Sequence, residues 1–172
     1  MHDSLKTYSY LVLARRKILD WSRPLSLQQH AQVFPIGLGT LARTLTHIMI
    51  CEWYYVQRIE GREVPPYGEW PIQDEDPPAF DILEAAWNEQ AARTLETVRA
   101  IHDWGRKIEY QVDDDGRPMV ITASASDIFT QLVLHEVHHR GQVMSMLRRL
   151  GVDVQDIDFN ALMYERRAAT PA

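Results

Sequence analysis

Apolar residues recur at helical spacing in four long stretches of the chain. At about 3.6 residues per turn, side chains three and four positions apart share one face of a helix, and each stretch repeats apolar residues at that spacing. A single short turn and a short terminal helix supplement the long stretches. The pattern predicts an all-α fold with long helices over residues 4–21, 38–59, 79–104 and 128–150, a turn around 26–31 and a short helix from Ile157.

Two segments between the long stretches break the helical pattern. Residues 63–78 are rich in proline and carry an acidic run, so no regular helix forms there, and we expect a long connection that crosses the bundle. Residues 107–112 alternate apolar and polar, and the sequence DDDG then precedes RPMVI, which predicts a small β-hairpin. The acids at 113–115 lack the spacing of a calcium loop and are interpreted as turn residues.

The last long stretch carries a pair of histidines on one face. His135 and His139 are four positions apart, which places them about 40° apart around a helix axis, so both imidazoles can bind one metal ion. Ile128 and Met146 lie near the same face, and we therefore expect the pair to point inward. His138 lies about 80° from the bisector of the pair, and we expect it at the surface or beside the ligands.

The same helix has a predicted start. Ser124 or Ser126 is expected to cap it, with Asp127 available as the capping-box partner of Ser124.

The second long stretch supplies a third histidine. Apolar residues nearly encircle this helix, which predicts burial, and polar side chains on a buried helix need partners. His47 alone would be interpreted as a core histidine with one hydrogen bond, but the inward pair favours a metal ligand. Three histidines with open positions are typical of a catalytic metal site. The polar positions recur about once per turn: Thr40, Thr44, His47, Cys51, Tyr54 and Arg58.

Further residues near these histidines have open roles. Cys51 lies one turn from His47 and is either an extra ligand or a small buried side chain, of which the second is favoured. Ligand histidines need acceptors on their other ring nitrogen, and the candidates are Gln142, Thr44 and Tyr54. Gly141 is expected to let a neighbouring helix approach closely.

The letters HEVHH also match the zinc-protease motif H-E-x-x-H, in which the glutamate is a general base. The extended motif fails, because Gln142 occupies its glycine position and Ser145 its last histidine position. Two interpretations of Glu136 stay open: a base beside the metal, or a solvated surface residue. The second is favoured.

Composition limits the class of protein. The 172 residues are 45% hydrophobic and 24% charged, which suits one domain over residues 1–172 with a sizeable core. The net charge of −6 argues against a nucleic-acid partner, since phosphate backbones need a basic surface. The arginine pairs at 15–16, 148–149 and 166–167 are interpreted as solvated helix faces.

Cellular context follows from what the chain lacks. One cysteine excludes an intramolecular disulfide framework, and no apolar run approaches the roughly 20 residues that span a bilayer. The first residues lack the organisation of a signal peptide. We expect a cytoplasmic protein that acts on a small molecule, with no nucleic-acid or membrane partner.

The sequence resembles the DinB family of DinB/YfiT-like metalloenzymes. The resemblance rests on LTHIMICEWYY at 45–55 with LHEVHHRGQVMSMLRRLG at 134–151, and extends to the DG at 115–116 and DIDFNALMY at 156–164. It implies an up-down-down-up four-helix bundle, frequent homodimers, and a divalent ion (nickel, zinc or manganese) on three histidines. These correspond to His47, His135 and His139. Most members have no assigned reaction, and those assigned depend on a low-molecular-weight thiol cosubstrate.

Three function classes stay open from the sequence. The favoured class is a metal-dependent enzyme, either a thiol-dependent S-transferase or isomerase or a hydrolase, with Glu136, Gln142 and Tyr54 as catalytic candidates. An ion on three neutral imidazoles keeps its charge and lowers the pKa of bound water from about 15.7 toward 7. The alternatives are a metal-binding, stress-related protein without catalytic activity and a helical interaction module whose histidines are relics.

Overall fold

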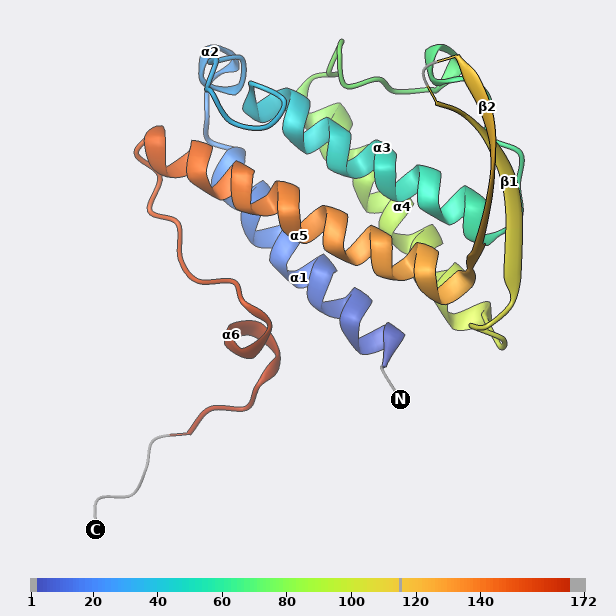
Figure 1. The fold of residues 1–172 in the computed structure, drawn as a ribbon. Helices are drawn as coiled ribbons and strands as arrows, with labels where there is room; N and C mark the ends of the chain where they lie inside the picture. Colours follow the sequence, from blue (N-terminus) through green and yellow to red (C-terminus); the bar gives the residue numbers. More distant parts are fainter. Residues whose placement is uncertain (1–2, 115, 168–172) are drawn as a thin grey trace.

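Four long helices lie side by side in the computed structural model, which describes residues 3–114 and 116–167 (Figure 1). They are α1 (Ser4–Ser22), α3 (Leu41–Ile59), α4 (Phe80–Ala100) and α5 (Ala125–Arg149). Three short helical segments accompany them: α2 (Leu27–His30), η1 (Tyr67–Glu69) and α6 (Phe159–Met163). The predicted helical fold is confirmed, although the helix expected to reach residue 104 ends at Ala100 and the one expected from residue 38 begins at Leu41.

The core lies where these helices meet. α3 packs against both α5 and α4, and α1 packs against α4 and α5 from the other side. Apolar burial of this kind contributes about 25 cal/mol per Å² of surface removed from water. The largest fully buried side chains come from all four long helices and include Trp87, Tyr8, Leu11, Leu41, Leu132 and Met146.

The start of α5 is fixed by a capping box. The Ser124 hydroxyl accepts a hydrogen bond from the Asp127 backbone at 3.0 Å, and the Asp127 carboxylate accepts one from the Ser124 backbone at 2.9 Å. Two of the unpaired N–H groups at the helix terminus are thereby satisfied. Ser124, and not Ser126, is therefore the cap.

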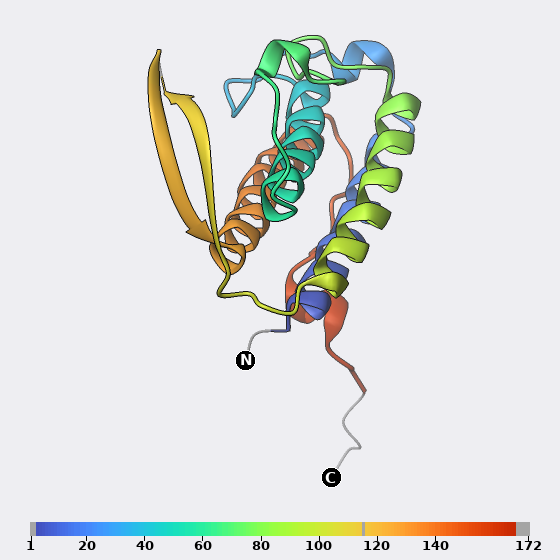
Figure 2. The same cartoon turned by 90° about the vertical axis from the view of Figure 1, so that its right-hand side faces the viewer.

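A two-stranded hairpin precedes α5, as predicted. β1 (Lys107–Asp114) pairs antiparallel with β2 (Arg117–Ser124), with Tyr110 opposite Ile121. Figure 2 shows the hairpin rising from the start of α5 beside the helices. At its tip Asp113 accepts a hydrogen bond from the Gly116 backbone at 2.7 Å, and Gly116 has a φ of 79°, a left-handed value that favours glycine. The turn interpretation of Asp113 is confirmed, while residue 115 lies outside the described residues.

The proline-rich connection runs back along α3. The Asp74 carbonyl accepts a hydrogen bond from Arg43 Nε at 3.1 Å, so the connection returns to the first half of the helix that precedes it. η1 is its one regular turn among the described residues. This path brings an acidic segment next to His47.

A buried ion cluster links three helices and corrects two expectations. Arg15 and Glu136 were expected in solvent, but their exposed fractions are 4% and 3%. Arg15 Nη2 lies 2.5 Å from Glu52 Oε2 and 2.7 Å from Glu136 Oε2, and Arg140 lies beside Glu136. The apolar spacing predicted that the buried face of α5 is centred on His135 and His139. In the structure the buried face is centred on Glu136, one residue after His135.

Glu52 is the most heavily bonded member of this cluster. Its carboxylate also accepts hydrogen bonds from Tyr8, Thr94 and Trp87. Burial alone would lower the pKa of Arg15, but the carboxylates of Glu136 and Glu52 outweigh it and hold that pKa above its usual range. Arg15 is therefore charged in the core.

Replacing Arg15 with alanine should destabilise the fold strongly. The change leaves the carboxylates of Glu52 and Glu136 buried without their shared cation, a loss that costs about 3–5 kcal/mol. Urea unfolding followed by circular dichroism measures it. The neighbouring Arg16 is exposed, so Arg16→Ala should stay within about 0.5 kcal/mol of the parent. Equal effects of the two substitutions would contradict a bridging role for Arg15.

Candidate metal centre

Three histidines from two helices meet at one point. His47 comes from α3, and His135 and His139 come from α5. One ring nitrogen of each lies within 4.8 Å of the others, and His135 Nε2 is 3.2 Å from His47 Nε2. The ring centroids are 4.4–5.0 Å apart. The structure thus brings together the three residues that the sequence singled out.

Two of the histidines have a fixed tautomer. His47 Nδ1 lies 2.7 Å from Asp74 Oδ2, and His139 Nδ1 lies 2.8 Å from Gln142 Oε1. Carboxylate and amide oxygens accept, so each Nδ1 carries the proton. The Nε2 atoms of His47 and His139 therefore present lone pairs.

The donor set fits a divalent metal ion. Metal–nitrogen distances of about 2.0–2.1 Å place the nitrogens of neighbouring histidine ligands roughly 2.9–3.4 Å apart. The separation of 3.2 Å between His47 Nε2 and His135 Nε2 falls in that range. All three nitrogens lie within 4.8 Å of one another, so rotations of the imidazoles would be enough to bring them to ligand spacing. His47, His135 and His139 are suited to hold the ion that the family resemblance implies.

The surroundings of the two α5 histidines, His135 and His139, favour their neutral form. Burial, together with the neighbouring rings of His139, His47 and His138, lowers the pKa of His135 to about 3. Burial also lowers the pKa of His139. Neutral imidazole is the form that ligates metals, so the lowered pKa values of these two histidines suit a ligand role near neutral pH.

Asp74 is the functional residue that sequence reasoning missed. Its side chain is 6% exposed, and besides His47 its carboxylate accepts a hydrogen bond from the Tyr67 hydroxyl. That hydroxyl in turn accepts one from the Asp74 backbone at 3.0 Å. The sequence does not distinguish Asp74 from the two acids that follow it at 75 and 76. Asp74 contacts His47 because of the path that the connection takes along α3.

Gln142 is the one candidate acceptor that contacts a histidine ring. The Thr44 hydroxyl donates to the Thr40 carbonyl instead, and Tyr54 stacks on Trp70. Gln142 also lies 3.0 Å from His138 Nε2 through its amide nitrogen. Gln142 therefore contacts both the exposed His138 and the half-buried His139.

A loop glycine makes room for Gln142. Gly37 has a φ of 51°, and a Cβ built there would lie 2.2 Å from Gln142 Oε1. A side chain at position 37 would therefore displace the amide that holds His139. The close approach expected at Gly141 is wrong, because a Cβ there would meet nothing within 4 Å among the described residues.

Cys51 lies beside His47 without joining the histidine group. Its Sγ is 3.7 Å from His47 Nε2. Burial raises the pKa of the thiol to about 12, and the negative charge of Asp74 contributes. In the metal-free chain Cys51 is therefore a neutral, partly buried thiol, the role that the sequence favoured.

Glu136 and Tyr54 stand apart from the histidines. The Glu136 carboxylate binds Arg15 in the core cluster, and Glu136 is about 100° around the axis of α5 from His135. Tyr54 stacks on Trp70 and lies under the Arg58 guanidinium at 5.0 Å. A different tyrosine, Tyr55, lies next to the histidine group, with its ring 5.8 Å from that of His135.

Comparisons with known proteins agree on one family. The model of the DinB family matches residues 1–169. Among solved structures, a DinB-like protein from Bacillus cereus superposes with a TM-score of 0.64 over 89% of this chain and 94% of its own, at 20% sequence identity. That likeness shows the fold. Among curated proteins none matches the chain significantly. None of the helices in the described residues has the length and apolar content to cross a membrane.

The stability of the metal-free chain should fall on acidification. The folded pKa of His135, about 3, lies below the unfolded value near 6.5, so the unfolded chain binds more protons between these values. Lowering the pH from about 6.5 toward 3 therefore favours unfolding. His135→Gln should flatten this dependence, measured as the urea midpoint at pH 7 and pH 5 with a chelator present. His102→Gln, at an exposed position, is the control, and an unchanged slope in His135→Gln would contradict the assignment.

Proposed function

The chain belongs to the DinB family, and on this premise we propose that it is a metal-dependent enzyme acting on a small molecule. One observation carries the proposal. His47, His135 and His139 direct ring nitrogens to a common point, while Asp74 and Gln142 hold the opposite nitrogen of two of them. Such outer hydrogen bonds fix the ring orientation and raise the basicity of a ligand.

Three protein ligands suit a catalytic site better than a structural one. Structural sites close the shell with four protein ligands, whereas catalytic sites leave a position for water or substrate. When bound, a divalent ion supplies Lewis acidity that lowers the pKa of a water or thiol and polarises a carbonyl. The three neutral imidazoles preserve its charge. This open donor set favours an enzyme over a metal-binding protein without catalysis.

Within that class, thiol-dependent transfer or isomerisation is favoured over hydrolysis. A thiol, with an ordinary pKa near 8.5, needs far less help to ionise than water near 15.7. The carboxylates near the site are poorly placed to act as a general base that deprotonates water. Glu136 is bound in the core cluster, and Asp74 is hydrogen-bonded to His47 and Tyr67. A nucleophile that ionises readily therefore suits these residues best.

The proposal includes the wider expectations of the family. The four long helices form an up-down-down-up bundle, the chain is a cytoplasmic homodimer, and the ion is nickel, zinc or manganese. Three imidazoles suit several such ions, since selectivity follows geometry and supply. The connection that returns along α3 supports the bundle topology, because it lets α4 start near the start of α3.

Metal content and turnover test the function together. We expect tag-free protein to contain near-stoichiometric transition metal by elemental mass spectrometry. The metal-loaded chain should then turn over a panel of thiols paired with electrophiles. His135→Ala should lose both the metal and the activity, and His138→Ala, at an exposed neighbour, should keep both. A chain that binds no zinc, nickel or manganese contradicts the metal site, and a metal-loaded chain that cleaves only esters or amides supports a hydrolase instead.

The carboxylate of Asp74 should tune metal affinity. Asp74→Asn keeps the shape but weakens the hydrogen bond to His47 Nδ1, and losing such an outer partner typically costs about 10–100-fold in affinity. Competition with a chromogenic chelator measures the change. Glu75→Gln removes the adjacent exposed acid and should leave affinity unchanged. Equal losses in both variants would mean that the connection acts only through its overall charge.

A further inference from the structure

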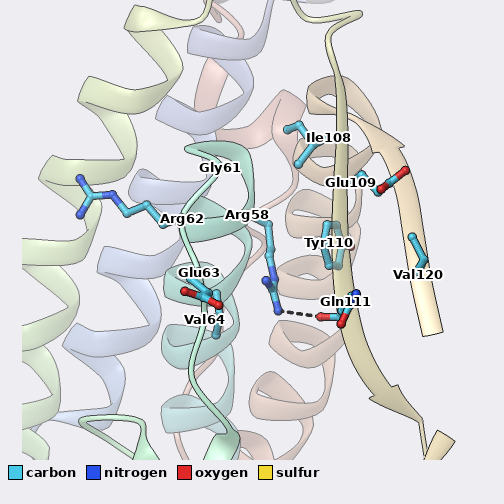
Figure 3. Close-up of a pocket in the computed structure, with 10 residues that line it drawn as sticks. All are labelled: Arg58, Gly61, Arg62, Glu63, Val64, Ile108, Glu109, Tyr110, Gln111 and Val120. Carbon is cyan, nitrogen blue, oxygen red and sulfur yellow. Dashed lines mark hydrogen bonds between the residues drawn. The ribbon is translucent and has the colours of Figure 1, made fainter. Parts of the chain in front are cut away.

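A recess lies between the end of α3 and the hairpin. Its cavity of about 620 Å³ is bounded by Arg58, residues 61–64 and strand β1 (Figure 3). An adjoining cavity of about 570 Å³ shares Arg58, Val64 and Gln111 and reaches Trp70. Both volumes are in the range of small-molecule sites. The ligand histidines are not among the described residues that line either cavity.

Arg58 forms the floor of this recess. Its exposed fraction is 8%, and its guanidinium lies 4.6 Å from the ring centroid of Tyr110 and 5.0 Å from that of Tyr54. Nη2 donates to the Gln111 carbonyl across a long 3.5 Å, the contact drawn in Figure 3. Among the described residues, Nε has no hydrogen-bond partner.

The charge of Arg58 is not matched by a protein anion. Over the described parts of the chain, no carboxylate forms an ion pair with it. The nearby Glu60 pairs with Arg62 at 2.7 Å and Arg93 at 2.6 Å. Burying an unpaired cation is costly, and contacts with two aromatic rings recover only part of that cost. Arg58 thus keeps hydrogen-bonding capacity and positive charge inside a recess.

We propose that this recess binds the carboxylate of a small molecule with a flat, apolar body, and that Arg58 is the residue that binds the carboxylate. A planar guanidinium matches a carboxylate in geometry and charge. Glu63 and Glu109 also line the recess and repel an anion in proportion to its charge, which favours a singly charged carboxylate over a dianion such as phosphate. Tyr54, Tyr110 and Val64 provide walls for the apolar body.

The recess and the histidines lie along one helix. Arg58 follows His47 by eleven residues, about 16 Å along α3 at 1.5 Å per residue. Tyr67 lines the adjoining cavity and also bonds Asp74, the partner of His47. An elongated carboxylate held by Arg58 would extend toward the ligand histidines. This link to the substrate rests on the proposed function, whereas carboxylate binding does not.

Benzoate and benzamide provide the test, because they share a shape and differ in charge. We expect benzoate to shift the Arg58 Nε–H signal of the ¹⁵N-labelled chain saturably at constant ionic strength. Benzamide and inorganic phosphate should bind at least tenfold more weakly. Equal binding of benzoate and benzamide, tighter binding of phosphate, or no saturable shift with benzoate would overturn the proposal, and none of these results depends on a variant folding.

Variants assign the binding to this recess. Arg58→Gln should remove the preference for benzoate over benzamide, and Arg58→Lys should retain part of it, with both followed by backbone amide signals. Arg16→Gln removes one charge at an exposed site on α1 and should change nothing. A preference that survives in Arg58→Gln would overturn the assignment. His135→Ala separates the two proposals: it should lose metal and still bind benzoate, whereas Arg58→Gln should still bind metal.

Discussion

The bridge that Arg15 makes between Glu52 and Glu136 sets α3 and α5 against each other. In the sequence Glu136 directly follows His135, and Glu52 directly follows Cys51, the neighbour of His47. Because successive residues are about 100° apart around a helix, the carboxylates face the core and the histidines lie on a different face of each helix. The spacing of the three ring nitrogens depends on this buried pairing, which is intolerant of losing one partner.

Local patterns predicted much of this structure. The four-residue spacing of His135 and His139 and the match of Ser124 with Asp127 act over one or two helical turns, so they could be identified without tertiary information. The expected exposure of Arg15 and Glu136 to solvent was wrong for a related reason. Polar residues count against burial in a pattern, and only the contact between distant helices shows that these charges neutralise each other.

Asp74 and Arg58 show the limit of pattern reasoning. Asp74 contacts His47 because a proline-rich connection folds back along α3, and no periodicity encodes that path. Arg58 was visible as part of a polar line, but its missing ion-pair partner depends on where the hairpin docks. In both cases the sequence shows the residue type but does not predict the contacts of its side chain, since segments far apart in the chain provide those contacts.

The histidines also connect the site to the order in which the chain folds. His47 and His135 are 88 residues apart in sequence, so the full donor set exists only after α5 has docked on α3. His135 and His139, by contrast, come together as soon as one helix forms. A nascent chain therefore offers a two-point chelate first and the complete set last. A metal ion bound at the end of folding would lock the contact between α3 and α5 and would tie the lifetime of the native state to metal supply.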